Sequence, residues 1–245
     1  MTEVKLMKSN QVLETFNRKS WQYTVYKEFE ATLLSESRSF PCIYGIAGMQ
    51  SQQLRFGFSD SMEPSEVAAL LSEYLPNARH YGRNTSLVIF SKPEAVVSVE
   101  DYEHRFWMLL KDTHMYDGKE WPTSIPCELD HPGWEWCFGG EPIFVVCNTP
   151  AHINRQSRRA SSFMVTFQPR WVFDAILGTE AKSEKVLAAI RDRLNSFDFI
   201  DPSPALGRYG QTENREFAQY FLDDTNSEIK CPYASLTKAK TSEAA

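Results

Sequence analysis

Short apolar runs alternate with amphipathic segments along this chain, and this alternation restricts its fold more than any other sequence feature. Residues 86–90 read SLVIF and residues 54–59 read LRFGFS, which are compositions typical of buried strands. Two further strands are expected at residues 142–146 and 162–167. No apolar run reaches the roughly 18 residues of a transmembrane helix. We therefore expect an α+β or three-layer α/β fold, with a small central sheet of about four strands.

Segments with helical spacing flank the expected strands. In one of them Pro64 suits a first helical turn, and Pro76 ends the helix. In another, Ser98 is a candidate N-cap with Asp101 three residues later. The expected helices are residues 10–36, the segment after Pro64, the segment after Ser98, residues 182–194 and, as a short helix, residues 215–222.

The size and charge of the chain limit its function classes. All 245 residues are expected to form one domain, with the polar residues 234–245 as a flexible tail. The net charge of −6 argues against a dedicated nucleic-acid binder and against a polybasic membrane anchor. The first residues contain no apolar signal core, so a soluble cytoplasmic protein is expected.

The five cysteines are widely spaced and include no Cys-x-x-Cys pair, which leaves zinc-finger and iron–sulfur sites unsupported. Cys42 stands out because it follows Pro41 and is followed by Gly45, so its backbone is constrained. A thiolate there would ligate iron or act as a nucleophile. The alternative is an inert, buried cysteine in a tight connection.

Residues 112–141 are rich in Pro, Gly, Trp and acids, and they show little periodicity. A loop of this length within a domain is usually functional. Trp134, Trp136 and Phe138 could wall a pocket for a planar ring, and Gly139-Gly140 permits a sharp turn before Glu141. The alternative is an apolar lid that packs onto the domain.

Residues 147–159 follow the strand-like sequence IFVVC and combine one imidazole with three guanidinium groups. Asn148, His152, Arg155 and Arg158 lie in this segment. A neutral imidazole can ligate iron, and arginines bind carboxylates or phosphates. The segment therefore suits a haem with its two propionates, a phosphate or carboxylate substrate without metal, or simply a solvated basic turn.

Taken together, these segments resemble the YqcI/YcgG family, from about residue 15 to residue 233. The ordered set is more specific than any single motif, although Tyr233 stands where phenylalanine is expected. The matching residues are Phe40-Pro41-Cys42 with Gly45, Arg105-Phe106-Trp107, Trp121-Pro122, Trp134, Cys137-Phe138-Gly139-Gly140-Glu141-Pro142, Asn148, Pro150, His152, Arg155, Ser157, Arg158, Gln168-Pro169-Arg170, Val172-Phe173-Asp174, Gln219-Tyr220-Phe221 and Cys231-Pro232-Tyr233.

The resemblance implies a haem-dependent oxygenase that hydroxylates a nitrogen of a small amino-acid-like substrate, such as the guanidine of arginine, in a biosynthetic pathway. The implied cofactor is haem b, with iron ligated by His152 or, as the alternative, by Cys42. Arg155 and Arg158 would pair with the propionates. Asn148 and Phe138 complete the expected cofactor-binding set.

Two further residues receive catalytic roles from the same resemblance. Trp134 would wall the haem or the substrate, together with Trp136 and Phe138, and Glu141 would hold a cationic guanidinium or amine. The implied partners are the substrate, dioxygen or peroxide, and an external electron donor, with a homodimer left open. The alternatives are a haem-binding sensor or carrier, a metal-free thiol enzyme that uses Cys42 near His152, and an interaction module.

Overall fold

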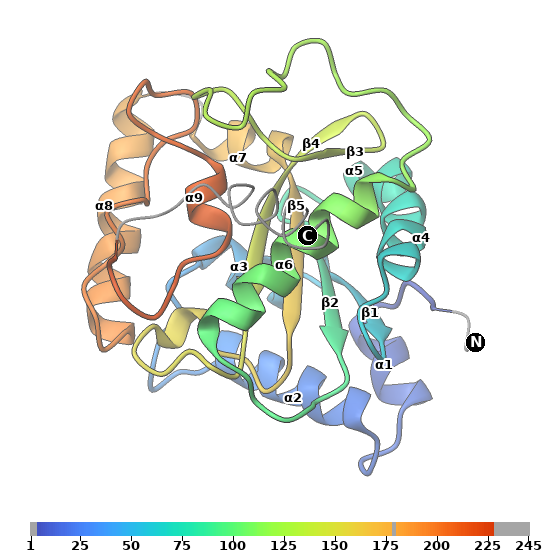
Figure 1. Ribbon diagram of the computed structural model, residues 1–245. Helices are drawn as coiled ribbons and strands as arrows, with labels where there is room; N and C mark the ends of the chain where they lie inside the picture. Colours follow the sequence, from blue (N-terminus) through green and yellow to red (C-terminus); the bar gives the residue numbers. More distant parts are fainter. Residues whose placement is uncertain (1–3, 178–179, 228–245) are drawn as a thin grey trace, which may run out of the picture.

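A five-stranded mixed sheet forms the centre of the protein (Figure 1), seen in a computed structural model that describes residues 4–177 and 180–227. Its strand order is β1-β2-β5-β4-β3. β1 and β2 are parallel, and the other neighbouring pairs are antiparallel. The strands are β1 (Arg55–Ser59), β2 (Leu87–Ser91), β3 (Cys137–Phe138), β4 (Glu141–Asn148) and β5 (Met164–Pro169).

All four strands expected from the sequence are present, and the sheet has a fifth, β3, of two residues. β3 pairs with β4 across a turn formed by Gly139 and Gly140, whose φ angles are 63° and 77°. Two successive positive φ angles define the tight hairpin turn that matches the twist of the strands, and glycine adopts them without strain. The sharp turn expected before Glu141 is therefore confirmed.

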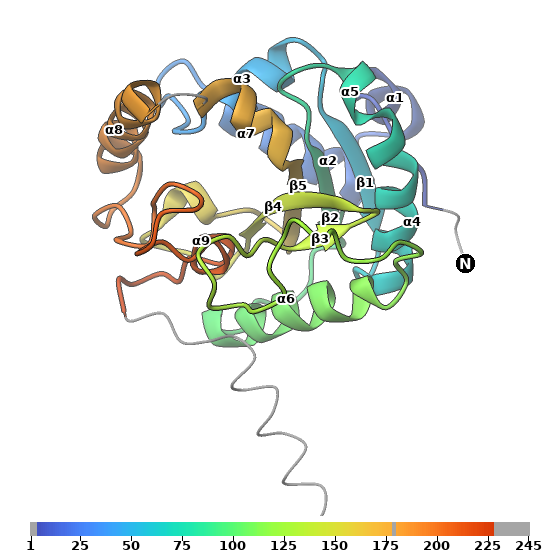
Figure 2. The same cartoon turned by 90° about the horizontal axis from the view of Figure 1, so that it is seen from above.

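Alternate residues of the strands divide the sheet into two faces with different surroundings. One face, which we call the packed face, carries Leu87 and Ile89 of β2, Val145 and Cys147 of β4, and Val165 and Phe167 of β5. α4 (Pro64–Tyr74), α6 (Val99–His114) and α9 (Phe217–Tyr220) cover it, together with the long loop after α6 (Figure 2).

The opposite face, which we call the cavity face, is covered differently along its width. At the β1–β2 edge, Phe56, Val88 and Phe90 pack against α1 (Ser9–Thr15) and α2 (Trp21–Leu33). Towards β5 and β4 the covering elements are α3 (Ile43–Gln50), α7 (Arg170–Leu177) and α8 (Glu180–Phe197), which lie on this side of the sheet (Figure 2).

The helix at residues 10–36 was expected to be continuous, and that expectation is wrong. The chain turns after Thr15, and Ser20 caps a second helix by accepting a hydrogen bond from Tyr23 N. A serine hydroxyl at this position satisfies one of the amide donors that every new helix leaves unpaired. The expected cap at Ser98 is confirmed, since its hydroxyl accepts from Asp101 N at 3.0 Å.

α3 and α7 were not expected. The segment IYGIAGMQ of α3 has two glycines and no polar face, and α7 follows Pro169 directly. The expected helices at residues 182–194 and 215–222 correspond to α8 and to the short α9. The expected tail at 234–245 and the motif Cys231-Pro232-Tyr233 lie outside the described residues.

Candidate functional site

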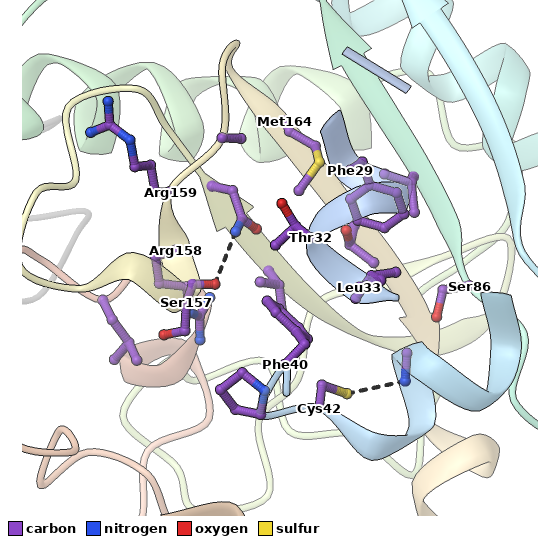
Figure 3. A pocket seen from close by; sticks show the side chains of 18 of the residues that line it. Phe29, Thr32, Leu33, Phe40, Cys42, Ser86, Ser157, Arg158, Arg159 and Met164 are labelled. Atoms are coloured by element: carbon purple, nitrogen blue, oxygen red, sulfur yellow. Dashed lines mark hydrogen bonds between the residues drawn. The ribbon is translucent and has the colours of Figure 1, made fainter. Parts of the chain in front are cut away.

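A cavity of about 940 Å³ lies on the cavity face of the sheet, at the end formed by β4 and β5. This volume is within the range of small-molecule and cofactor pockets. Alternate residues of three strands form its base: Val88 and Phe90 of β2, Phe144, Val146 and Asn148 of β4, and Met164, Thr166 and Gln168 of β5. α2 and the segments around Cys42 and Arg158 form its sides (Figure 3). α8 also lines it.

The walls of the cavity are mainly apolar. Phe29 and Leu33 of α2 face it, as do Leu187 and Ile190 of α8. Phe40 also lines it and packs edge-to-face on Phe197, with ring centroids 5.4 Å apart. A flat hydrophobic molecule with a few polar groups therefore matches this lining.

Cys42 lies on the cavity wall at the start of α3 (Figure 3). Its Sγ accepts a hydrogen bond from Gly45 N at 3.3 Å, so the thiol replaces the hydroxyl of an ordinary N-cap. Burial raises the pKa of this thiol, while the amides of Gly45 and Tyr44 and the charge of Arg158 oppose that change. A raised pKa disfavours a free thiolate nucleophile, whereas a metal ion deprotonates a coordinating thiol.

The charged residues of the cavity wall are mostly cations. Among the described residues, six arginines line it, against two glutamates, so an anionic group is favoured there. The arginines are Arg38, Arg155, Arg158, Arg159, Arg170 and Arg191, and the glutamates are Glu28 and Glu216.

Arg155 and Arg158 are both buried, with 1% and 7% of their surface exposed. Arg155 donates to the carbonyl oxygens of Asp223 and Thr225, at 2.7 and 2.9 Å. Arg158 donates to the carbonyl oxygens of Tyr220 and Gln219, at 3.1 and 2.9 Å. Burial, together with the neighbouring charge of Arg155, lowers the pKa of Arg158 to about 10.

A second charged group lies at the start of α7, where Arg170 contacts both Glu135 and Glu216. Its Nε donates to Glu135 Oε2 at 2.7 Å, and its guanidinium carbon lies 4.0 Å from the centre of the Tyr209 ring. Burial raises the pKa of Glu135 to about 7, against the opposing effect of Arg170. Arg170, Glu216 and Tyr209 line the cavity, so this cluster forms one of its polar walls.

His152 is fully buried and is not among the residues that line the cavity. Its Nε2 lies 2.7 Å from the carbonyl oxygen of Leu222, and its Nδ1 lies 2.9 Å from the hydroxyl of Thr149. Since a carbonyl only accepts, Nε2 carries the proton and Nδ1 accepts from Thr149. Neither nitrogen is free to ligate iron or to deprotonate Cys42, so in this arrangement His152 holds the segment around it in place.

The aromatic loop also lies away from the cavity. Trp134, Trp136 and Phe138 are each at most 4% exposed and belong to the core of the packed face. Trp136 and Phe138 stack on each other with centroids 6.0 Å apart. Glu141 begins β4 at the hairpin and is not a cavity-lining residue. The structure therefore follows the alternative of an apolar lid that packs onto the domain.

Of the residues predicted for the site, the structure brings Cys42, Asn148, Arg155 and Arg158 together around one cavity. Sequence reasoning missed the contributions of α2 and α8 and the cluster of Arg170 with its two glutamates. One signal for the cluster was present: Glu135 stands between Trp134 and Trp136, and a carboxylate within an apolar run is usually buried and paired.

Within 4–177 and 180–227, no helix is both long and apolar enough to cross a bilayer. In that same part of the chain, no three His, Cys, Asp or Glu side chains gather as a metal site.

Comparison with known proteins gives a family and several relatives. The model of the YqcI/YcgG family matches residues 29–234. Two proteins of Bacillus subtilis (strain 168), "Uncharacterized protein YcgG" and "Uncharacterized protein YqcI", are each 41% identical over 225 residues, which is 88% of this chain and 89% of theirs.

A more distant relative is a Streptomyces lavendulae protein with the name "Putative N(omega)-hydroxy-L-arginine synthase DcsA". It is 28% identical over 240 residues, which is 93% of this chain and 89% of that protein. No solved structure matches the chain significantly.

Proposed function

Because this chain belongs to the YqcI/YcgG family, we propose that it is a haem-dependent oxygenase that hydroxylates a nitrogen of a small amino-acid-like substrate, such as the guanidine of arginine. The name of the Streptomyces lavendulae relative supports this reaction. The observation that carries the proposal is the position of Cys42, the one cysteine among the described residues that line the cavity.

The described residues of the cavity fit a haem. Its volume and apolar sides suit a large flat ring, and Cys42 offers a soft ligand of the kind that iron accepts. Arg155 and Arg158 offer buried cations for carboxylates. Since both nitrogens of His152 are already hydrogen-bonded, we propose Cys42 rather than His152 as the ligand. Asn148 also lines the cavity, and its contact with the haem stays a proposal.

In this proposal the haem supplies the oxygen-activating chemistry, and the protein positions the substrate. One oxygen atom of dioxygen enters the N–H bond, and the other becomes water with two protons and two electrons from an external donor. The apolar sides of the cavity exclude water from the reacting nitrogen. Glu216 lines the cavity, but it is paired with Arg170 and accepts from Asn214 and Gln219, so it is given no role toward the substrate.

An absorption spectrum of protein that is produced with a haem precursor tests this proposal. We expect a stoichiometric Soret band and, in the ferrous carbon monoxide form, the band typical of thiolate ligation. Cys42→Ser should lose the thiolate band. Cys147→Ser is the matched control, because Cys147 is buried on the packed face and should leave the spectrum unchanged.

Product analysis completes the test. With dioxygen and a chemical reductant, the loaded protein should convert L-arginine to a product heavier by one oxygen atom. An unchanged spectrum in Cys42→Ser would exclude the cysteine as ligand, and an unchanged spectrum in a His152→Gln variant would separately exclude His152. A protein that binds no haem after reconstitution would overturn the proposed function.

A further inference from the structure

We propose that Glu135 and Glu216 share one exchangeable proton beside the cavity, and that Glu216 passes this proton to a group bound there. The two side chains meet at Arg170, the first residue of α7, which contacts both carboxylates. The shared proton follows from the geometry of this cluster. Its use as a proton source for the reduction of dioxygen rests on the proposed function.

One guanidinium faces two carboxylates in the cluster. Arg170 Nε donates to Glu135 Oε2 at 2.7 Å, and Arg170 Nη2 contacts one oxygen atom of each glutamate. Glu135 and Glu216 are 0% and 3% exposed, so water does not screen their repulsion. Two negative charges thus meet at one nitrogen with one positive charge between them. A buried site with this excess of negative charge favours the uptake of a proton.

The remaining contacts of Glu216 do not remove the excess charge. Its Oε2 atom accepts from the side-chain amides of Asn214 and Gln219, both at 3.2 Å. These hydrogen bonds stabilise a carboxylate, but the amides carry no net charge. They hold Glu216 in place and leave one carboxyl of the pair without a cation of its own.

The other titratable groups around the pair do not compensate its charge either. Asp174 of α7 acts on Glu135 as a further negative charge. Tyr209 and Tyr220 donate their hydroxyl protons to backbone carbonyl oxygens, at 2.7 and 3.0 Å. Burial raises the pKa of both tyrosines and of Cys137, so these three groups are uncharged at neutral pH.

The pKa values of the cluster agree with one bound proton. Burial raises the pKa of Glu216, and it raises the pKa of Glu135 to about 7. Burial acts to lower the pKa of Arg170, but the charges of the two glutamates raise it overall, so the guanidinium stays protonated. Because the two carboxyls interact, the proton belongs to the pair rather than to one residue.

Glu216 connects the pair with the cavity, since it lines the cavity and Glu135 does not. The other carboxylate among the described lining residues, Glu28, is exposed. No histidine is among the described residues that line the cavity, and the arginines there keep their protons at neutral pH. Glu216 is therefore the buried carboxyl through which a proton leaves the pair for the cavity.

The proposed reaction gives this proton a destination. One oxygen atom of dioxygen becomes water and takes up two protons, and the pair supplies one of them. The O–H bond of the carboxyl breaks, its electron pair stays on the carboxylate, and the proton passes to that oxygen atom. Once the product leaves, solvent returns a proton to the pair. A local proton source is needed because the apolar sides of the cavity exclude bulk water during the reaction.

Infrared spectroscopy of the full-length protein tests the shared proton. The C=O stretch of a protonated carboxylic acid is separate from the bands of carboxylates, and it shifts in D2O. Glu135→Gln and Glu216→Gln each remove one carboxyl and leave one ion pair with Arg170. Glu94→Gln is the matched control, because the side chain of Glu94 is 51% exposed in its surface pair with Arg105. Circular dichroism would confirm that each variant is folded.

We expect the wild-type protein and the Glu94→Gln control to show one protonated carboxyl that titrates with an apparent pKa of about 7. Both cluster variants should lose this signal, because the remaining carboxylate is paired with Arg170 and stays ionised above about pH 5. The absence of a carboxyl that titrates near neutral pH in the wild-type protein overturns the shared proton. So does the same signal in both folded cluster variants.

Steady-state kinetics of the haem-loaded protein tests the transfer to the cavity. Glu216→Gln should lower kcat for arginine hydroxylation by at least about tenfold, since general acids contribute about 10²–10⁴-fold. The Soret band and KM should stay unchanged. In the wild-type protein, kcat should fall as the pH rises above about 7, and the variant should lack this step. An unchanged kcat and pH profile in a variant without the infrared signal overturns the transfer.

The two proposals fail separately. If the infrared signal is present while no haem is taken up, the shared proton is supported and the proposed oxygenase is overturned. If haem binds and arginine is hydroxylated while the wild-type protein lacks the signal, the oxygenase is supported and the shared proton is overturned.

Discussion

The two faces of the central sheet differ in how completely they are covered, although the same strands form both. On the packed face, Phe167 is fully buried against Trp136, with ring centroids 5.7 Å apart. One residue earlier, Thr166 on the cavity face is only half-buried and lines the cavity. The strand period of two thus separates a face that stabilises the fold from a face that is available for a ligand.

Neighbouring substitutions in β5 should show this difference most strongly. Phe167→Ala should reduce the free energy of unfolding by about 3–5 kcal/mol, because it leaves a cavity in a packed core. Thr166→Ala should cost about 1 kcal/mol or less, since its side chain already borders a cavity. Urea unfolding measures both. Equal losses would show that the cavity face is as tightly packed as the other.

Removing the cation that joins the two faces should have the next largest effect. Arg170 links Glu135, from the loop over the packed face, to Glu216, which lines the cavity. Arg170→Met should cost about 3 kcal/mol, because it leaves two buried carboxylates without their partner.

The control for this change is Arg215→Met. Arg215 pairs with Asp130, whose side chain is 90% exposed, and such surface pairs contribute little. A loss no greater for Arg170→Met than for this control would mean that the buried cluster does not stabilise the fold.

Two cysteines allow a kinetic comparison of the faces. Cys42 lines the cavity, whereas Cys147 is fully buried on the packed face. Burial raises the pKa of both thiols, so access decides their relative rates. In haem-free protein, iodoacetamide should modify Cys42 at least tenfold faster than Cys147, as measured by peptide mass spectrometry. The exposed Cys127 gives the reference rate, and faster labelling of Cys147 would contradict the assignment of the two faces.

The smallest effect concerns pH and His152. Burial lowers the pKa of His152, so between its folded and unfolded pKa values the unfolded state binds more protons. Stability from this residue is complete above about pH 6.5 and falls as the pH decreases, by at most about 1.4 kcal/mol per pH unit.

A His152→Gln variant isolates this contribution, because glutamine does not titrate. The difference in unfolding free energy between the wild-type protein and the variant should be larger at pH 7.5 than at pH 5.5. A constant difference across this range would mean that His152 accepts a proton in the folded state as easily as in the unfolded state.

The sequence was most informative where one pattern dominates a segment. The apolar residues of β2 and the cap at Ser98 were predicted correctly because local composition and tertiary burial agree there. α3 was missed because its glycines and apolar residues give neither a helical stripe nor a strand alternation. The helix packs against α2, and at Gly48 it closely approaches the backbone of Asn84.

The structure brings part of the predicted site together, for a similar reason. Cys42, Arg155 and Arg158 were placed near a ligand because their chemistry is unusual for a core, and the structure does place them on one cavity wall. Trp134, Trp136 and Phe138 suit both a pocket and a core, and only the packing around α6 decides between the two. The roles of these residues in binding stay predictions.

The hydrogen bonds of the turn that carries Arg155 and Arg158 also set the order in which the protein can be completed. His152, Arg155 and Arg158 find their carbonyl partners in residues 219–225, between 61 and 70 positions later in the chain. All five strands end by Pro169, so residues 219–225 are synthesised after the whole sheet. During synthesis, the strands can therefore pair before α9 and the segment after it finish this side of the cavity.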